Sequence, residues 1–175
     1  MARSLTSGTV LVLGGARSGK SAFAEQLVLD SGSQPLYVAT AQIWHDEMRS
    51  RVEAHRERRQ TQWQTLEEPL ELPSLLEREA RQGRAILVDC LTLWVTNLML
   101  AEADMADRFA SLCAALRKCE GLIVLVSNEV GLGIVPDNKM ARDFRDHAGR
   151  LHQDVAALAD QVHFNAAGLP LTLKG

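Results

Sequence analysis

The sequence contains few cysteines, only three among 175 residues. Cys90, Cys113 and Cys119 form no CxxC pair, and their odd number argues against a disulfide framework. The spacing of metal ligands is also absent. Cys90 lies in an apolar run, where a small buried side chain is expected. The cysteines therefore predict neither a disulfide scaffold nor a cysteine-based metal site.

Long hydrophobic runs are absent too. No apolar stretch approaches the roughly 20 residues that a membrane-spanning helix needs. The first nine residues carry one Arg and no long apolar core, so they do not have the pattern of a signal peptide. We therefore expect a cytoplasmic protein without a membrane span.

The sequence also lacks an excess of positive charge. Nineteen Lys and Arg against 22 Asp and Glu leave a net charge of −3, which argues against a nucleic-acid partner. The hydrophobic fraction of 46% with 23% charged residues is typical of a globular protein. Repeats, low-complexity tracts and linkers are not found, and roughly 150 residues is the usual size of one domain. We expect a single domain over residues 1–175, without a separate module for each catalytic step.

Short apolar runs alternate with helical patterns along the chain. The runs cover residues 9–13, 36–40, 85–89 and 122–127, and the sequence ends in a predicted hairpin of 161–165 and 169–173. The helical patterns cover 21–29, 74–82, 104–119 and 138–160. Strands that are apolar throughout are typical of parallel sheets buried on both faces. The pattern predicts an α/β fold: a mostly parallel central sheet, helices on both faces and an antiparallel hairpin at one edge.

The clearest motif follows the first predicted strand. Residues 14–21 read GGARSGKS and match the phosphate-binding pattern G-x-x-x-x-G-K-[ST] at every fixed position. In such a loop, backbone N–H groups surround phosphate oxygens at a helix N-terminus. Lys20 would reach the β- and γ-phosphates, and the Ser21 hydroxyl would bind Mg²⁺. A glycine-rich turn that carries Lys-Ser by chance is the alternative, but the flanking strand and helix favour the phosphate loop.

Polar residues end two further predicted strands, where the ligands of parallel sheets bind. Asp89 has the place of an acid that holds Mg²⁺ or its water shell, although it could instead cap the following helix. Asn128 and Glu129 precede the glycines of 131–133 and could contact substrate or build a turn. The spacing alone leaves the last choice open.

A charged helix is predicted over residues 46–59. Its few apolar residues, Met48 and Val52, lie on one face, and His55 continues that face. A neutral imidazole there could attack phosphorus. From the residues alone, a structural histidine beside solvated arginines is the more ordinary interpretation.

Several segments together resemble one family, the bifunctional adenosylcobinamide kinase / adenosylcobinamide-phosphate guanylyltransferases of cobalamin biosynthesis. The matching segments are GGARSGKS (14–21), YVATAQ (37–42), DEM (46–48), RVEAHRERR (51–59), residues 63–67, VDCLTLWVTNL (88–98), SNEVGLGIVPDN (127–138) and ARDFRDHAGRLHQ (141–153). They cover nearly the whole chain. The combination with SNEVGLGIVP and the histidine segment is far more specific than the phosphate loop alone.

The resemblance implies a RecA-type P-loop fold, a homotrimer and two reactions. The first phosphorylates the aminopropanol hydroxyl of adenosylcobinamide with ATP or GTP. The second transfers GMP from GTP to the adenosylcobinamide phosphate and releases pyrophosphate, with GMP carried covalently on a histidine that corresponds to His55. Lys20 is the second implied catalytic residue, and Mg²⁺ would bind at Ser21 and Asp89. The implied nucleotide contacts are Gly14, Gly15, Ala16, Arg17, Ser18, Gly19, Lys20, Ser21, Ala39, Thr40, Ala41, Arg56, Glu57, Arg58, Arg59, Glu67 and Asp89.

Two alternatives come from other classes. One is a monofunctional small-molecule P-loop kinase in which His55 is structural. The other is a nucleotide-dependent binding protein of the RecA type, against which the acidic charge balance counts. Trp44, Trp63 and Trp94 could flank a corrinoid or pack in the core.

Overall fold

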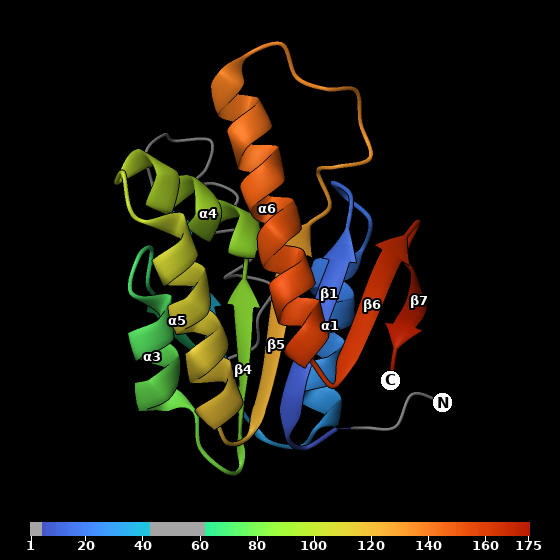
Figure 1. Cartoon of the computed structure of the whole chain (residues 1–175). Coiled ribbons are helices and arrows are strands. Elements are labelled where there is room, and N and C mark those ends of the chain that lie inside the picture. The colour runs from blue at the N-terminus through green and yellow to red at the C-terminus, as the bar shows by residue number, and fades with distance from the viewer. Residues whose placement is uncertain (1–4, 43–61) are drawn as a thin grey trace.

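The computed structural model describes residues 5–42 and 62–175 (Figure 1). Its strands are β1 (Gly8–Gly14), β2 (Gln34–Ala39), β3 (Gln64–Glu67), β4 (Arg84–Asp89), β5 (Leu122–Asn128), β6 (Gln161–Ala166) and β7 (Leu169–Lys174). Its helices are α1 (Lys20–Asp30), α3 (Leu72–Glu79), α4 (Leu91–Leu100), α5 (Met105–Lys118) and α6 (Lys139–Leu158). None of the helices within these ranges is long and apolar enough to cross a membrane.

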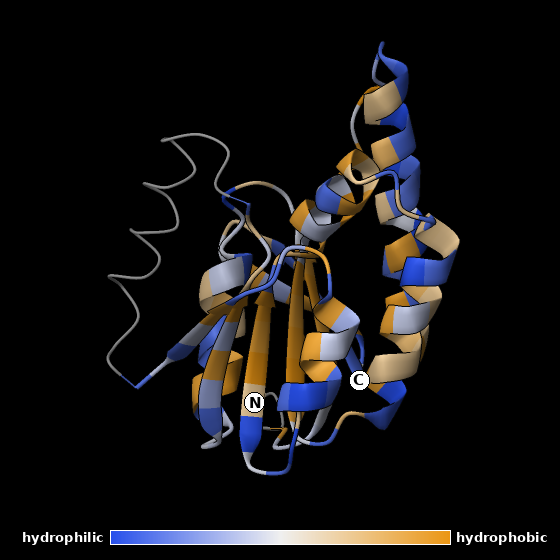
Figure 2. Ribbon diagram, turned by 90° about the vertical axis from the view of Figure 1, so that its left-hand side faces the viewer, coloured by the Kyte–Doolittle hydropathy of each residue, from blue (hydrophilic) through white to orange (hydrophobic). Residues whose placement is uncertain are grey.

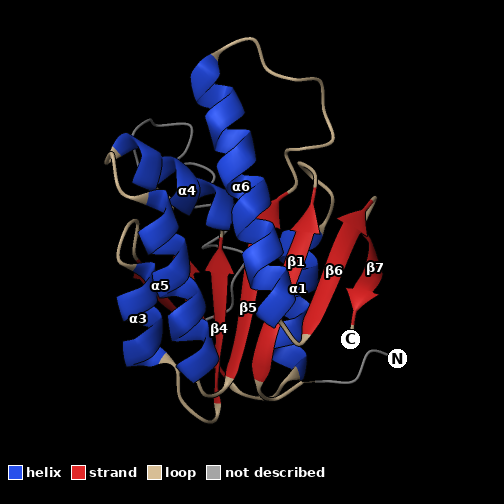
Figure 3. Ribbon diagram, viewed as in Figure 1, coloured by secondary structure: helices blue, strands red, loops and turns tan. Residues whose placement is uncertain are grey.

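All seven strands form one sheet in the order β3-β2-β4-β5-β1-β6-β7 (Figure 3). Every pairing is parallel except that of β6 with β7, so the predicted parallel sheet with an antiparallel edge hairpin is confirmed. The strand β1 lies between β5 and β6, and β5 separates it from β4. The carboxyl ends of β1, β4 and β5 therefore lie along one edge of the sheet, which is where the phosphate loop begins.

Different helices pack on the two faces of the sheet. Side chains at alternate positions of β1, such as Leu11, pack with α3, α4, α5 and α6 on one face. Val10 and Val12 point to the other face, where Ala24 and Val28 of α1 join them. Figure 2 shows the central strands as mostly hydrophobic, with hydrophilic residues on the outer sides of the helices. Strands that are apolar on both faces explain why the runs in the sequence are continuous rather than alternating.

Side-chain caps define two of the predicted helix starts. Asp104 accepts a hydrogen bond from the backbone N–H of Asp107 at 3.0 Å, and Asn138 accepts one from that of Ala141 at 2.7 Å. Both are the usual N-cap geometry, in which the side chain satisfies a free N–H of the first turn. The starts of α5 and α6 were therefore predictable from local chemistry.

Three elements differ from the sequence prediction. The helix α3 runs from Leu72 to Glu79 rather than over 74–82, because Ala80 is already extended and Gly83 shapes the turn into β4 at φ 79°. The strand β3 was not predicted, since it is only four residues long and exposed at both ends. The helix α4 was not predicted either, because its ten residues, seven of them apolar, show no clear amphipathic period.

Candidate nucleotide-binding site

The phosphate loop leaves β1 at Gly14 and enters α1 at Lys20. A Cβ atom on Gly14 would lie 2.5 Å from Ser18 Oγ and 2.6 Å from the backbone oxygen of Asn165. No side chain fits in that space, so the tight return of the loop over β1 and β6 requires glycine here. The first glycine of the motif is thus explained by packing as well as by phosphate access.

The second required glycine is Gly19, which precedes α1 with φ 89°. A Cβ atom there would be 2.9 Å from the Cα of Gly168 at the tip of the β6–β7 hairpin. The N–H of Gly168 donates to the carbonyl of Ser18 at 2.9 Å. The hairpin tip therefore supports the phosphate loop from the side, a role that the sequence did not reveal.

Lys20 is buried within the loop. Its Nζ donates a hydrogen bond to the carbonyl oxygen of Gly15 at 3.0 Å. The ammonium group thus lies across the loop that it belongs to. This places a positive charge where the loop would hold phosphate oxygens.

Ser21, in the first turn of α1, contacts the end of β4. Its Oγ donates a hydrogen bond to Asp89 Oδ2 at 3.3 Å, and Tyr37 Oη donates to the same oxygen at 3.2 Å. Asp89 does not cap the following helix, because the N-cap position of α4 is Cys90 and no side chain caps it. A hydroxyl and a carboxylate side by side at the phosphate loop are the hard oxygen donors that Mg²⁺ prefers. The residues expected to hold Mg²⁺ therefore fit that ion.

Two buried polar side chains near the loop have unpaired atoms. Ser18 Oγ lacks a hydrogen-bond partner, and so do both amide atoms of Asn165 on β6. Ser18 Oγ and the backbone oxygen of Asn165 both lie beside Gly14. A buried polar atom without a partner carries a free-energy cost, and such atoms commonly mark a functional site. Asn165 was not among the predicted site residues.

The segment after β2 contains three predicted nucleotide contacts, and Thr40 is the best defined of them. Thr40 Oγ1 donates to the carbonyl of Cys90 at 2.7 Å and accepts from the N–H of Cys90 at 2.9 Å. Its carbonyl accepts from Asn97 Nδ2 at 2.8 Å. The polar groups of Thr40 thus join β2 to the start of α4. Nucleotide contact at Ala39, Thr40 and Ala41 stays a prediction, with Ala41 more exposed than the other two.

Glu67 lies at the far end of the same edge. It ends β3, is exposed, and lies opposite Ala39 in the register of β2 and β3. Four strand spacings separate β3 from β1, which amounts to about 19 Å. Glu67 is therefore far from the start of the loop, although Asp89, which Ser21 contacts, lies only two strands away. A contact with the nucleotide stays a prediction.

The predicted nucleophile cannot be placed. His55 and the neighbouring Arg56, Glu57, Arg58 and Arg59 lie outside the described residues, as does Trp44. Trp94 is fully buried and donates through Nε1 to the carbonyl of Leu70 at 3.0 Å, so it belongs to the core. Trp63 packs edge-on against Tyr37, with ring centroids 6.4 Å apart.

Of the two roles left open for Asn128 and Glu129, turn building is seen for Glu129, and substrate contact stays a prediction. The carboxylate of Glu129 accepts from the N–H groups of Gly131 at 2.8 Å and Leu132 at 3.1 Å, so it builds a turn. Asn128 Nδ2 donates to Thr92 Oγ1 at 3.0 Å. Both residues also line a cavity of about 370 Å³ that borders the phosphate loop at Ala16.

A buried histidine lies behind the end of β5. His152 Nε2 and Ser127 Oγ are hydrogen-bonded at 2.6 Å. Burial lowers the pKa of His152 to about 4, and the negative charge of Glu129 opposes this shift. His152 is therefore neutral near pH 7. Its neutral ring holds the end of the strand next to the phosphate loop.

Comparison with known proteins identifies relatives over nearly the whole length. The family model described as "Cobinamide kinase / cobinamide phosphate guanyltransferase" matches residues 10–173. The chain is 51% identical over 169 residues to the bifunctional adenosylcobalamin biosynthesis protein CobP of Pseudomonas aeruginosa, covering 94% of this chain and 96% of the relative. It is 42% identical over 180 residues to the bifunctional adenosylcobalamin biosynthesis protein CobU of Escherichia coli, covering 94% and 99%.

Solved structures of low sequence identity share the fold. The flagellar accessory protein FlaH from Methanocaldococcus jannaschii aligns with a TM-score of 0.53 at 13% identity, over 95% of this chain and 78% of that one. The P4 protein from bacteriophage phi6, solved in complex with ADP, aligns with a TM-score of 0.50 at 16% identity, over 97% and 58%. These likenesses support the P-loop architecture that the loop and the strand order indicate.

Proposed function

Because this chain belongs to the cobinamide kinase / cobinamide phosphate guanyltransferase family, we propose that its one phosphate loop serves both reactions of that family. The enzyme phosphorylates the aminopropanol hydroxyl of adenosylcobinamide with ATP or GTP. It then transfers GMP from GTP to adenosylcobinamide phosphate, which gives adenosyl-GDP-cobinamide and pyrophosphate. Within the described residues, a single loop has the phosphate-binding pattern, so the two reactions share it.

In the kinase step, the acceptor oxygen forms a bond to the γ-phosphorus while the bond to the β,γ-bridging oxygen breaks. Little covalent assistance is needed, because positioning and charge stabilisation supply most of the rate enhancement of phosphoryl transfer. Lys20, which is folded across the loop, neutralises charge on the β- and γ-phosphates. The backbone N–H groups at the start of α1 add to this stabilisation.

In the guanylyl step, a ring nitrogen of His55 forms a bond to the α-phosphorus of GTP. The bond to the α,β-bridging oxygen breaks, and pyrophosphate leaves into the cradle of N–H groups. A phosphate oxygen of adenosylcobinamide phosphate then displaces His55 from phosphorus and restores the free imidazole. Arg56, Glu57, Arg58, Arg59 and Glu67 are proposed to contact the guanylyl group or the nucleotide near His55.

Ser21 and Asp89 are the residues proposed to hold Mg²⁺. The ion would shield the negative charge of the nucleotide phosphates during both transfers. Ser21 would contribute its hydroxyl, and Asp89 would bind directly or through water. A homotrimeric, cytoplasmic enzyme is proposed on the basis of the family alone.

The contact between Ser21 and Asp89 carries the proposal. It joins the phosphate loop, which follows β1, to an acid at the end of β4, although β5 lies between these two strands. The test of the guanylyl route is the intact mass of the protein after incubation with Mg²⁺ and GTP. The wild type should gain one GMP, stable in base and labile in acid, and His55→Ala should gain none. An adduct that persists in His55→Ala would overturn the choice of nucleophile. A wild type that never gains GMP but phosphorylates adenosylcobinamide would be a monofunctional kinase.

A further inference from the structure

The cavity beside the phosphate loop has a mixed lining that suits a particular part of a substrate. Its volume is about 370 Å³, which is at the small end of the ~300–1,000 Å³ range of ligand pockets. Ala16 of the phosphate loop forms part of its wall, and Thr92 and Thr96 of α4 contribute hydroxyl groups. Phe144 of α6 and Leu93 supply apolar surface. The cavity therefore fits a short arm that carries polar groups, and it is too small for a macrocycle.

The cavity lies near the end of the loop site that would hold the β- and γ-phosphates. Ser21, which the motif assigns to Mg²⁺, faces β4 through its contact with Asp89. Its neighbour Lys20, which the motif assigns to the β- and γ-phosphates, lies across the loop with its Nζ on the carbonyl of Gly15. Asn128 at the end of β5 and Thr92 at the start of α4 line the cavity on this same side. The hairpin tip at Gly168 lies on the opposite side of the loop, next to Gly19. The cavity thus opens on the side of the loop that faces β4 and β5, beside the groups that the motif assigns to the γ-phosphate and Mg²⁺.

The charge of the lining favours the neutral acceptor of the kinase step, adenosylcobinamide, over the acceptor of the guanylyl step, adenosylcobinamide phosphate. None of the eight described residues that line the cavity is Lys, Arg or His, and one of them, Glu129, is a carboxylate. A phosphate group beside this carboxylate would meet repulsion that no cation in the described lining offsets. A neutral alcohol would meet acceptors and donors instead, since each carboxylate oxygen has a second lone pair besides the one used by Gly131 or Leu132.

Apolar side chains continue from the rim of the cavity. Leu132 and Ile134, just after the lining residues Glu129 and Val130, are 82% and 97% exposed, and Val135 is also exposed. Figure 1 shows the connection from β5 to α6 standing above the carboxyl edge of the sheet. Clustered exposed apolar residues commonly mark a binding surface. They offer a surface for the bulk of a large ligand whose arm enters the cavity.

We propose that this cavity is the acceptor subsite of the kinase reaction and takes the aminopropanol arm of adenosylcobinamide. Glu129 accepts the hydrogen bond of the arm's hydroxyl and turns its oxygen towards the γ-phosphorus. As that oxygen bonds to phosphorus and the bond to the β,γ-bridging oxygen breaks, the hydroxyl proton passes to Glu129, and the corrinoid stays outside against the segment 131–135. Once Glu129 has released this proton to water, it repels the phosphorylated arm, so the product leaves the subsite. The inference rests on the proposed function, whose kinase step supplies the acceptor.

The test fills the cavity without touching the phosphate loop. Thr96 lies on the cavity side of α4, and among the residues that the structure describes its hydroxyl donates to the carbonyl of Thr92 in the same helix. Thr96→Leu should therefore keep the fold and raise the KM for adenosylcobinamide about tenfold or more in the kinase reaction. The KM for ATP or GTP and the GMP adduct formed from GTP alone should stay unchanged, because neither involves the acceptor.

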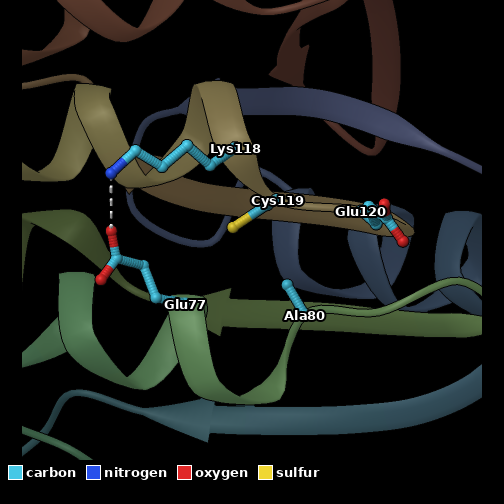
Figure 4. A pocket seen from close by; sticks show the side chains of 5 residues that line it. All are labelled: Glu77, Ala80, Lys118, Cys119 and Glu120. Carbon is cyan, nitrogen blue, oxygen red and sulfur yellow. Dashed lines mark ion pairs between the residues drawn. The ribbon is translucent and has the colours of Figure 1, made fainter.

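The matched control fills a different cavity. A space of about 380 Å³ between the ends of α3 and α5 is lined by Glu77, Ala80, Lys118, Cys119 and Glu120, and an ion pair of 3.6 Å joins Lys118 to Glu77 (Figure 4). It lies at the amino ends of β4 and β5, on the opposite edge of the sheet from the phosphate loop. Ala80→Leu should leave both KM values unchanged.

The outcomes separate this inference from the proposed function. An unchanged KM for adenosylcobinamide in Thr96→Leu would overturn the subsite, and a higher KM for the nucleotide alone would assign the cavity to the nucleotide. If the wild type had no kinase activity, the proposed function would fail. An absorbance titration of the wild type and of Thr96→Leu with adenosylcobinamide would still show whether the cavity binds the acceptor. Weaker binding by Thr96→Leu supports it, and equal binding contradicts it.

Discussion

The Ser21 hydroxyl donates a hydrogen bond to the carboxylate of Asp89 at 3.3 Å, although 68 positions separate the two residues in the chain. The sheet creates this contact, because β5 lies between β1 and β4 and aligns the ends of all three strands. Tyr37 donates to the same carboxylate oxygen from β2. Side chains thus tie the end of β4 to the phosphate loop through Ser21 and to β2 through Tyr37.

Removal of the charge of Asp89 should weaken Mg²⁺ binding. For Asp89→Asn we expect the Mg²⁺ concentration at half-maximal kinase activity to rise about 10- to 100-fold, because a strong oxygen donor is lost. Tyr37→Phe is the matched control, since it removes only the hydroxyl that bonds to Asp89. Its effect should be smaller. Equal Mg²⁺ dependence of Asp89→Asn and the wild type would exclude Asp89 from the metal site.

Gly19→Ala should destabilise the phosphate loop. The new Cβ would lie 2.9 Å from Gly168 Cα, and the backbone is left-handed at φ 89°. We expect a loss of about 2 kcal/mol in the free energy of unfolding together with weaker nucleotide binding. Gly32→Ala provides the comparison, because its φ of 67° is also left-handed but no atom lies near the new Cβ. Urea unfolding of both variants separates the two costs, and equal losses would contradict the close approach to the hairpin tip.

The stability of the protein should fall as the pH is lowered from about 6.5 towards 4. Burial lowers the pKa of His152 to about 4, whereas a free imidazole has a pKa near ~6.5. In this range the unfolded chain takes up a proton that the folded protein resists, which costs up to about 3 kcal/mol. Burial lowers the pKa of His163 as well, so it acts in the same direction.

Replacement of His152 tests this origin of the pH dependence. His152→Asn should show a flatter decline in the free energy of unfolding between pH 7 and pH 4.5, because the share of His152 is lost while that of His163 remains. Urea denaturation at both pH values is the measurement. The same decline in both proteins would mean that His152 is not the group responsible.

Local chemistry made much of this fold predictable. The motif of residues 14–21, the apolar runs and the caps at Asp104 and Asn138 each depend on neighbours within a few positions. The strand β3 escaped prediction because its place at the sheet edge is set by pairing with β2 rather than by its own residues. The helix α4 escaped because Leu91 and Trp94 are buried, as are most of the residues around them, so no polar stripe appears in the sequence.

The sequence predicted which residues belong to the site, but not which contacts they make. Ser21 could be named from the phosphate-loop motif, and Asp89 could be named because a carboxylate at a strand end suits Mg²⁺. The support of Gly19 by Gly168, and the buried amide of Asn165, depend on how a hairpin far along the chain packs on the loop. No pattern in the sequence encodes that packing. His55, the predicted nucleophile, was named through the family resemblance, and it lies outside the described residues.

The measurement that most directly tests the use of one loop for two reactions is a pair of assays on Lys20→Ala. The first assay measures phosphorylation of adenosylcobinamide, and the second measures the GMP adduct formed from GTP by intact mass. Lys139→Ala, which removes an exposed lysine paired with Asp143, controls for the loss of one positive charge. We expect Lys20→Ala to lose both activities while remaining folded by circular dichroism, and Lys139→Ala to keep both. If Lys20→Ala kept kinase activity, or kept the adduct while losing the kinase, the shared loop would be contradicted.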